Sequence, residues 1–388
     1  MRILHCFRAP VGGLFRHVLD LAEEQAKRGH DVGILAGSTA EDRLTTSKLA
    51  AIAPKLSLGI KRIPISRQPG FADMAAVRAT VAHAQTLDLD VLHGHGAKGG
   101  TYARLAARWL ALRGRPVKSF YTPHGGSLNF KPGTLEQWLL LRVERILDSM
   151  TSGLIFESAY ASRVYGTCVK SGGAPQRVIP NGLNIADFAP VQPRPDATDL
   201  LFVGELRRIK GVDLLLNALA EIKPEKAVTA TIVGSGPEEE HLKDMASRLG
   251  LDGLVRFPGA MPARDAFILG RIMVVPSLAE SLPYVVLEAT AAGLPLIATN
   301  VGGVPEIVSE TDTPLIEPGN VGALKSAILS VLADPDLATQ RAARLRSRVG
   351  GRFTVSAMTD AVLSFYAEAR PKPTRLPFLA TKLQSHRG

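Results

Sequence analysis

Residues 272–295 read IMVVPSLAESLPYVVLEATAAGLP, and this stretch gives the clearest indication of the fold class. Its start, Ile272–Pro276, is short, apolar and rich in β-branched residues, which predicts a buried strand. Ser281 and Pro283 are typical of a helix N-cap and first turn, and Gly293 is typical of a helix end. The stretch therefore predicts a strand, a loop and a helix in succession, which is the repeating unit of an α/β fold.

Two glutamates stand eight residues apart, Glu280 in the predicted loop between strand and helix and Glu288 along the predicted helix. The helix N-terminus between them offers unpaired backbone amides and a partial positive charge, which suit a phosphate. Charged pairs are common on solvated helix faces, but Val285, Val286 and Leu287 leave little solvated face here. Because a buried carboxylate needs partners, and sugar hydroxyls can supply them, this layout predicts a nucleotide-sugar pocket.

The length of 388 residues predicts two domains rather than one. The two cysteines, Cys6 and Cys168, lack metal-site spacing and are expected to be small core residues in a reducing compartment. The sequence contains no uncharged apolar run of about 18 residues, so no transmembrane span is predicted. The N-terminus is typical of a first strand rather than of a signal peptide. We therefore expect a cytoplasmic protein.

The charge balance favours anionic partners, because 46 Lys and Arg exceed 36 Asp and Glu and give a net charge of +10. No nucleic-acid-binding motif is present, and an aromatic content of 5% argues against a base-stacking surface. We therefore expect no nucleic acid partner, and an anionic substrate or an anionic membrane surface on the inner face of the membrane.

Apolar runs and amphipathic segments alternate along the N-terminal half, which predicts a parallel sheet covered on both faces. Strands are expected over Arg2–Phe7, Asp31–Ala36, Asp90–His93, Val117–Tyr121 and Gly153–Phe156. Helices are expected over Leu14–Arg28, Phe71–Leu87, Gly99–Leu112, Leu135–Met150 and Ser158–Tyr165.

The proline-rich stretch APVQPRPDAT predicts a linker over residues 189–198, after an N-terminal domain over 1–188. The alternation then restarts and predicts a second domain over 199–354. A helix over 355–370 could cross back to the N-terminal domain, and 371–388 reads as a flexible basic tail. The fold class is α/β, with two doubly wound, Rossmann-like domains facing each other across a cleft, where ligands bind at strand carboxyl ends.

Two loops of the second domain suit a phosphate. The first follows the predicted strand Leu200–Val203 and carries Arg207 and Lys210, which could neutralise a diphosphate, although most charge clusters are solvated surface. The second contains Gly234 and Gly236, which let the backbone approach a ligand but are equally explained by a turn.

Five motifs carry a resemblance to a known family: IPNGLNIADF, VGELRRIKGVDLLLNAL, IVGSGPEEEHL, VRFPGAMP and ESLPYVVLEATAAGLPLIATNVGGVPEIV. In this order they resemble the retaining GT-B glycosyltransferases of family 4. The resemblance covers the C-terminal half and, more loosely, the N-terminal half. It implies a GT-B fold and sugar transfer from a nucleotide-sugar.

The resemblance implies roles for single residues. Lys210 falls on the lysine that binds the diphosphate, Glu280 on the glutamate near the transferred sugar, and Glu288 on the one that binds the ribose. Glu205 stands where family members commonly carry arginine, so Arg207 is expected to supply that charge.

Ser281 and Pro283 replace glycines of the family signature. The amides that follow Glu280, at Ser281 and Leu282, are expected to contact the donor.

In the N-terminal half, Gly12 and Gly13 resemble the family's glycine loop near the donor phosphates, although a simple turn explains them equally well. His124 in TPHGGS falls on a histidine that contacts the sugar.

Two other motifs are weaker. Gly94, Gly96 and Gly99 match a dinucleotide fingerprint, but the expected acidic residue about 20 positions later is missing. His93 and His95 lack the further ligands that zinc needs, so we expect no metal.

The segment LEQWLLLRVERILDSM, residues 135–150, suits either a core helix or a helix in a membrane interface, and its pattern favours the core.

These features predict a metal-independent, hexosyltransferase-like enzyme without a cofactor, and the resemblance implies retention at the anomeric carbon. Its expected partners are a nucleoside diphosphate-sugar and a glycan or glycolipid acceptor, in the assembly of cell-envelope polysaccharide or glycolipid. A nucleotide-sugar epimerase or hydrolase on the same fold remains an alternative, as does a catalytically silent nucleotide-sugar-binding protein. The donor base, the sugar and the acceptor are left open.

Overall fold

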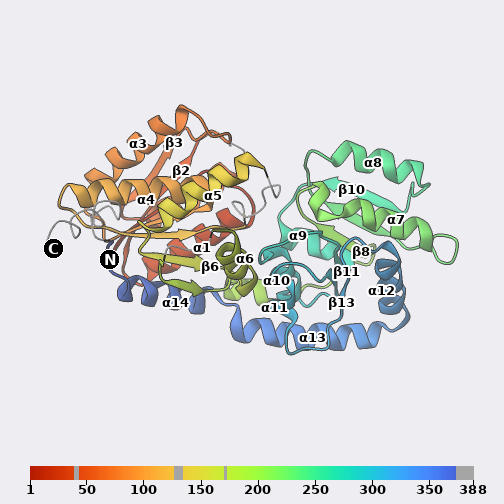
Figure 1. Cartoon of the computed structure of the whole chain (residues 1–388). Helices are drawn as coiled ribbons and strands as arrows, with labels where there is room; N and C mark the ends of the chain where they lie inside the picture. Colours follow the sequence, from red (N-terminus) through yellow and green to blue (C-terminus); the bar gives the residue numbers. More distant parts are fainter. Residues whose placement is uncertain (39–42, 126–133, 170–172, 373–388) are drawn as a thin grey trace, which may run out of the picture. The chain divides into compact units, whose positions relative to one another are not determined.

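The structure is a computed structural model that describes residues 1–38, 43–125, 134–169 and 173–372 (Figure 1). The chain divides into two compact units. Unit 1 comprises residues 1–157, 162–179 and the chain from Thr359, and unit 2 comprises residues 158–161 and 180–358. The chain therefore enters unit 2 after Ile179, ahead of the expected linker, and returns to unit 1 within its last helix.

Unit 1 is built on a parallel sheet with the strand order β3-β2-β1-β4-β5-β6-β7. Its strands are β1 (Arg2–Phe7), β2 (Asp31–Gly37), β3 (Gly59–Ile63), β4 (Val91–His95), β5 (Lys118–Thr122), β6 (Gly153–Phe156) and β7 (Gln176–Val178). The chain builds outward from β1 in one direction and then restarts at β4 in the other, so the topological switch point lies between β1 and β4.

Helices cover both faces of this sheet. They are α1 (Gly12–Lys27), α2 (Arg43–Ile52), α3 (Ala72–Thr86), α4 (Gly96–Leu112), α5 (Leu135–Asp148), α6 (Ala159–Val169) and α14 (Val355–Glu368). α3 and α4 pack on the face that carries Leu4 and Cys6, and α1 and α2 pack on the face that carries Phe7 and Ile34. Tyr366 of α14 also packs on this second face.

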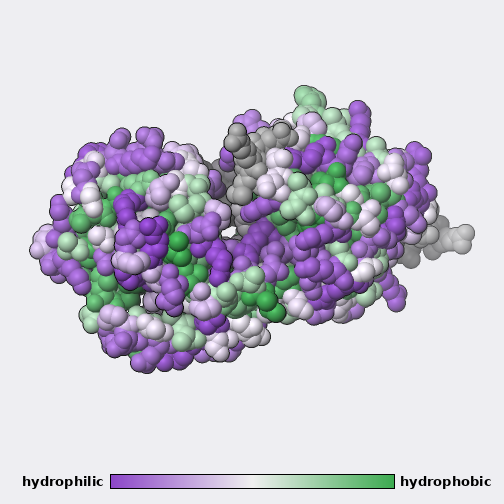
Figure 2. Space-filling view, turned by 180° about the vertical axis from the view of Figure 1, so that it is seen from behind, coloured by the Kyte–Doolittle hydropathy of each residue, from purple (hydrophilic) through white to green (hydrophobic). Residues whose placement is uncertain are grey.

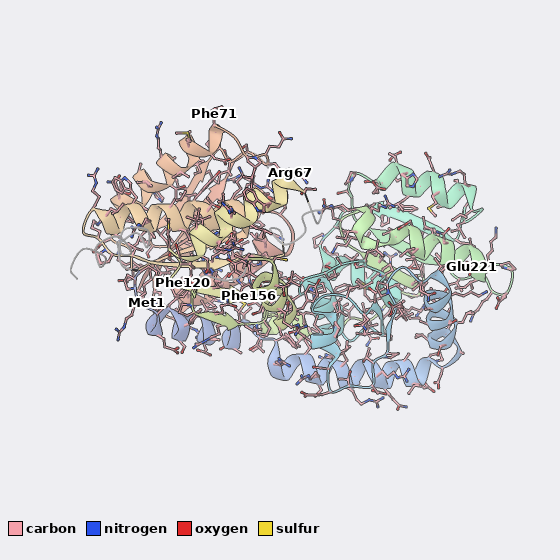
Figure 3. The ribbon with its side chains drawn as sticks, in the orientation of Figure 1. Met1, Arg67, Phe71, Phe120, Phe156 and Glu221 are labelled. Carbon is pink, nitrogen blue, oxygen red and sulfur yellow. The ribbon has the colours of Figure 1, made fainter. Side chains whose placement is uncertain are left out.

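Several of the buried side chains of unit 1 are aromatic. Phe120 and Phe156 lie at the sheet and are fully buried, whereas Phe71, at the start of α3, projects outward with 93% of its surface exposed (Figure 3). Cys6 is a buried core residue, as expected, and Cys168 is partly buried; both are free thiols.

Unit 2 has a second parallel sheet, with the order β10-β9-β8-β11-β12-β13. Its strands are β8 (Thr198–Val203), β9 (Ala230–Val233), β10 (Val255–Gly259), β11 (Gly270–Val275), β12 (Leu296–Thr299) and β13 (Leu315–Ile316). The switch point of this sheet lies between β8 and β11.

The helices of unit 2 form two layers around this sheet. They are α7 (Val212–Ile222), α8 (Glu239–Arg248), α9 (Ala263–Ala266), α10 (Tyr284–Ala291), α11 (Val304–Val308), α12 (Val321–Ala333) and α13 (Pro335–Arg352). α7, α8 and α12 share one core cluster, and α9, α10, α11 and α13 share the other. The predicted α/β fold class, with two doubly wound sheets, is thus confirmed.

Several predicted boundaries were wrong in detail. α10 begins at Tyr284 with Pro283 as its N-cap, so Ser281 is not the cap. α1 begins at Gly12, so Gly12 and Gly13 form its first turn rather than a preceding loop. The missed elements are either short or polar, because such segments lack a clear apolar period: α2, β3, β7, α9, β12, α11, β13 and α13.

The preference for a core role of residues 135–150 was only partly right. α5 buries Leu147, but Trp138, Leu139, Val143 and Ile146 are each 49–58% exposed. Arg142 stacks its guanidinium 4.3 Å from the centroid of the Trp138 ring. The outer side of α5 is therefore an exposed apolar face with a basic group on it.

Among the described residues, no helix is long and apolar enough to cross a membrane. The face of the molecule in Figure 2 mixes hydrophilic and apolar side chains. Residues 373–388, most of the expected basic tail, lie outside the described residues.

Candidate active site

Two loops at the carboxyl edge of the unit 2 sheet pack backbone against backbone, and glycines allow this contact. A Cβ at Gly234 would lie 1.8 Å from the Gly204 carbonyl oxygen, and one at Gly236 would lie 2.4 Å from the Leu206 carbonyl oxygen. Gly234 also has a φ of 149°, which L side chains rarely adopt. Loop packing alone therefore explains both glycines, and their contact with a donor stays a prediction.

Lys210 and Glu280 meet at the switch point of this sheet. The Lys210 Nζ lies 2.6 Å from the Glu280 Oε1, and the Ser277 hydroxyl donates to the same oxygen at 2.7 Å. The Leu278 amide donates to the Ile209 carbonyl at 2.8 Å, which ties the loop after β11 to the loop after β8. The side chain of Glu280 is 9% exposed and that of Lys210 is 24% exposed, so the pair is shielded but open to a ligand.

The loop after β12 holds Glu280 from a third side. A Cβ at Gly302 would lie 1.7 Å from the Glu280 carbonyl oxygen, and the Gly303 amide donates to the Ser281 carbonyl at 2.6 Å. The loops after β8 and β12 therefore hold the backbone near Glu280, and the hydrogen bonds from Lys210 and Ser277 hold its carboxylate.

Glu288 lies in α10, where Val286 and Leu287 are fully buried. Glu288 itself is partly buried, which agrees with its apolar neighbours. Ahead of the helix, Leu282 is buried and its carbonyl accepts a hydrogen bond from the Asn181 side chain at 3.0 Å. The roles predicted for Glu288 and Leu282 stay predictions.

Arg207 makes an ion pair with Glu205, the residue that stands where the family commonly carries arginine. The Arg207 Nη1 lies 3.6 Å from the Glu205 Oε2, and both side chains are about half exposed. The carboxylate therefore already offsets part of the charge that Arg207 was expected to supply.

In unit 1, a helix follows each of the two strands that flank the switch point. α1 begins at Gly12 after β1, and α4 begins at Gly96 after β4; both glycines have a positive φ, 62° and 65°. Val11, the N-cap of α1, makes no side-chain capping hydrogen bond. Gly12 and Gly13 thus form a helix start that suits an anion, and their donor contact stays a prediction.

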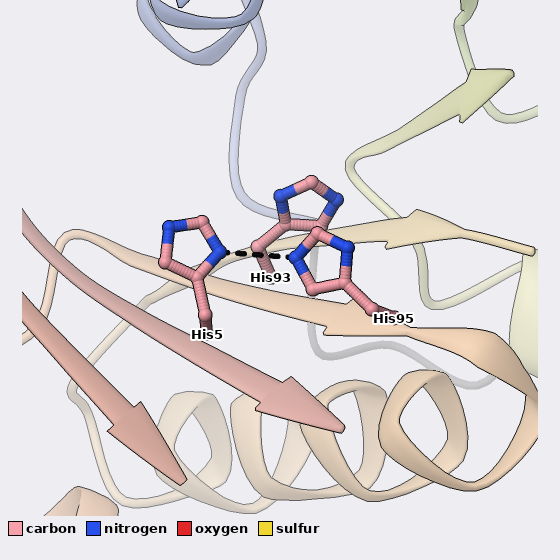
Figure 4. A group of neighbouring side chains, drawn as sticks. All are labelled: His5, His93 and His95. Atoms are coloured by element: carbon pink, nitrogen blue, oxygen red, sulfur yellow. Dashed lines mark hydrogen bonds between the residues drawn. The ribbon is translucent and has the colours of Figure 1, made fainter. Parts of the chain in front are cut away.

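Histidines gather at the same switch point (Figure 4). His5 on β1 is the register partner of His93 on β4, and Phe7 is the partner of His95. Because alternate residues of a strand point to one face, all three histidine rings lie on the face covered by α1 and α14. The His5 Nδ1 lies 3.0 Å from the His95 Nε2, and the His95 Nδ1 lies 3.1 Å from the Nε2 of His124, which follows β5.

The rings of His5, His93 and His95 are shielded from water, that of His124 is partly exposed, and all four are uncharged near neutral pH. Burial lowers the pKa of His5 to about 4 and that of His124 to about 3. Burial lowers the pKa of His93 and His95 well below 6.5, and the neighbouring histidines add to this effect. His17 of α1 packs edge-on against His124, with ring centroids 4.8 Å apart.

His5 and His17 were not among the residues that the sequence predicted for the site. The alternation of residues along β1 places His5 on the same buried face as Phe7, and this could be seen in the sequence. The pairing of β1 with β4, which brings His5 to His93, could not. The His93 ring also reaches two hydroxyls, the Tyr366 Oη at 2.6 Å from Nδ1 and the Thr122 Oγ1 at 2.9 Å from Nε2.

The premise that His93 and His95 lack a third ligand was wrong. Ring nitrogens of His5, His93 and His95 lie within 4.8 Å of one another, as do those of His17, His95 and His124. A metal ion on the first three rings would have to replace the hydrogen bond between His5 and His95. The expectation of no metal stays a prediction.

Comparisons with known proteins identify the class. Residues 11–187 match glycosyltransferase family 4, and residues 197–334 match the group 1 glycosyl transferases. EpsD of Bacillus subtilis (strain 168), described as a glycosyltransferase, is 31% identical over 349 residues, which cover 84% of this chain and 88% of EpsD. The chain therefore belongs to the group 1, family 4 glycosyltransferases.

A glycogen synthase from Mycobacterium tuberculosis is 28% identical over 410 residues, 95% of each chain. Among solved structures, a sucrose-phosphate synthase from Thermosynechococcus elongatus has a TM-score of 0.78 at 22% identity and covers 95% of this chain and 98% of its own. HepE from Anabaena, in complex with UDP, has a TM-score of 0.75 at 21% identity and covers 95% of this chain and all of its own. These likenesses establish the GT-B fold.

Proposed function

We propose that this glycosyltransferase transfers a sugar from a nucleoside diphosphate-sugar to a hydroxyl of a glycan or glycolipid, with retention and without a metal. The observation that carries the proposal is the ion pair of Lys210 and Glu280 at the switch point of unit 2, where ligands of doubly wound sheets bind.

The proposed chemistry assigns one task to each charged group. As the bond between the anomeric carbon and the phosphate oxygen breaks, the diphosphate leaves with the electron pair, and Lys210 stabilises its charge. Glu280 accepts a hydrogen bond from a hydroxyl of the transferred sugar, and Glu288 accepts from the ribose. The acceptor oxygen forms the new bond on the same face and gives its proton to the leaving diphosphate.

The first donors to test are uridine nucleotides, because HepE has been solved in complex with UDP and with UDP-glucose. Thermal shift of the full chain against UDP-, GDP- and ADP-sugars identifies the base. A donor at about 100 times its dissociation constant adds roughly 2.7 kcal/mol to the stability.

Turnover then separates the alternatives. Product that appears only with an acceptor supports the transferase. Release of free sugar or of an epimer without acceptor would indicate a hydrolase or epimerase, and binding without turnover across acceptors would indicate a silent binding protein.

The exposed apolar face of α5 favours contact with an anionic membrane on its cytoplasmic side. Such a contact would suit a glycolipid acceptor in cell-envelope assembly. Trp138, Leu139, Val143 and Ile146 expose apolar surface on α5, and Arg142 lies among them. Apolar side chains with arginine at headgroup level suit a membrane interface.

A further inference from the structure

A continuous series of hydrogen bonds runs through unit 1 from α1 to the loop after β5. The Gln25 Oε1 lies 2.8 Å from the His5 Nε2, the His5 Nδ1 lies 3.0 Å from the His95 Nε2, and the His95 Nδ1 lies 3.1 Å from the His124 Nε2. Figure 4 shows the middle bond, between the rings of His5 and His95. We call Gln25, His5, His95 and His124 the histidine chain.

Proton counting gives this chain a direction. A neutral imidazole has one N–H donor and one lone pair, and an amide oxygen only accepts. The His5 Nε2 therefore donates to Gln25, so the His5 Nδ1 accepts from the His95 Nε2–H. The His95 Nδ1 then accepts from the His124 Nε2–H, which leaves the His124 Nδ1 with the lone pair.

Burial supports the neutral state that this count requires. Gln25 and His5 are 0% exposed and His95 is 1% exposed, so desolvation opposes a positive charge on the two rings. His124 is the one partly exposed member, so the chain meets solvent there.

The backbone at His124 is unusual for a residue with a side chain. Its φ of 51° lies in the left-handed region, between Pro123 and Gly125, at the carboxyl end of β5. Such conformations cost free energy and cluster at functional sites. The strain places the His124 ring where its Nε2 reaches His95.

We propose that Gln25, His5 and His95 are positioning residues that hold His124 as the neutral Nε2–H tautomer, so that its Nδ1 accepts a hydrogen bond from a substrate hydroxyl. The role of His124 toward a hydroxyl rests on the proposed function. A neutral ring that presents a lone pair suits a sugar hydroxyl and repels a phosphate oxygen, so His124 belongs to sugar recognition rather than to diphosphate binding.

The direct test is the ring tautomer in the full chain without any ligand. Two-bond ¹H–¹⁵N correlation spectra of the ¹⁵N-labelled protein at pH 7.5 should show His124 with a protonated Nε2 and an unprotonated Nδ1. A protonated Nδ1 would overturn the proposal, because it would mean that Gln25 presents its amide nitrogen and that every donor is reversed.

The positioning role is tested with Gln25→Met, which keeps the length of the side chain but removes the acceptor. We expect His124 to populate both tautomers and kcat/KM for the sugar donor to fall about tenfold, while the affinity for UDP alone is unchanged. Gln25→Glu keeps an acceptor at residue 25 and should restore the tautomer. His241→Gln, an exposed residue on α8, is the matched control and should change nothing.

An unchanged tautomer in Gln25→Met would overturn the proposal even if activity falls, because a purely structural role would leave the tautomer alone. If Gln25→Met does not fold, the wild-type spectrum still decides. Zn²⁺ is a further probe: stoichiometric binding that shifts His5, His93 and His95 together would replace the chain by a metal site.

The tautomer does not depend on substrate, so its result stands apart from the transferase assay. The expected tautomer in a protein without turnover would contradict the proposed function and leave the histidine chain in place.

Discussion

At the switch point of unit 2, the functional candidates are charged side chains on loops, while at the switch point of unit 1 they are uncharged rings mostly on strands. Lys210 and Glu280 follow β8 and β11 and are partly exposed, whereas His5 and His95 lie within β1 and β4 and are buried. Both sheets are doubly wound, so topology alone does not set the chemistry of the edge.

This difference indicates that the loops and the strands of one fold suit two different tasks. A loop can keep a charged group hydrated until a ligand arrives, which suits the charge of a leaving diphosphate. A strand holds a ring in one orientation, and burial keeps that ring neutral, which suits the orientation of a hydroxyl. Substitutions in the charged loops of unit 2 and in unit 1 should separate these two tasks, and the largest effect is expected at Lys210.

Lys210→Ala should lower kcat by roughly 100- to 1,000-fold, because one preorganised donor to the developing charge is lost. Donor binding should weaken less than turnover falls, since the charge on the leaving group grows in the transition state. Steady-state kinetics with the donor found in the thermal-shift panel measures both. Lys243→Ala, at a partly exposed position on α8, is the control, and a near-normal kcat in Lys210→Ala would remove Lys210 from the mechanism.

The exposed face of α5 extends the contrast to the surface of unit 1. Replacing Trp138 and Leu139 with Ser should weaken binding to phosphatidylglycerol vesicles about 100-fold at low salt, since each buried apolar side chain contributes about 1.5 kcal/mol or more. The intrinsic tryptophan fluorescence of the wild type should shift to the blue on binding.

Phe71→Ser is the matched control, because Phe71 is exposed elsewhere in unit 1. Added salt should also weaken binding, as charges are screened over about 10 Å at 0.1 M. No binding of the wild type even at low salt would favour a soluble acceptor.

The neutral histidines of unit 1 predict a loss of stability in acid. The folded-state pKa of His5 is about 4 and the ordinary value is 6.5, so between these values the unfolded chain binds a proton that the folded chain does not. The contribution of each such histidine to the free energy of unfolding is therefore fully present above pH 6.5. It falls as the pH drops, by up to about 1.4 kcal/mol per pH unit.

Urea unfolding at pH 7.5, 6.0 and 5.0 measures this dependence. His5→Gln should have a shallower slope, and His241→Gln should keep the wild-type slope. A free energy of unfolding that stays constant over this range would show that the rings are not held neutral.

Glu288→Gln should raise the donor KM at least about tenfold, because it removes the charge from hydrogen bonds to the ribose that are worth about 1.5–3 kcal/mol. The side chain keeps its size, so folding should be unaffected. An unchanged KM would make Glu288 a structural residue of α10.

Arg207→Ala should have the smallest effect, less than about fivefold on kcat/KM, because exposed ion pairs such as that with Glu205 contribute about 0–1 kcal/mol. Arg208→Ala, the neighbouring exposed arginine, is the comparison. A large loss for Arg208 and none for Arg207 would shift the assignment by one residue.

The fold class and most of the helices and strands could be predicted from the amino-acid sequence. The alternation of apolar strands and amphipathic helices is a local pattern, so β1 and β6 were predicted with their observed bounds. The family motifs likewise lie in single stretches of chain, and the comparisons confirm the class they indicated.

The contacts between residues that are distant in the sequence could not be predicted and follow from the pairing of the strands. Lys210 and Glu280 are brought together by the pairing of β8 with β11, and His5 joins His93 through the pairing of β1 with β4. The order of strands in a parallel sheet depends on crossovers that pass over a whole helix, so no local pattern contains it. The exposure of Trp138 could not be predicted either. The amphipathic pattern of α5 does not show which of its apolar side chains another element covers.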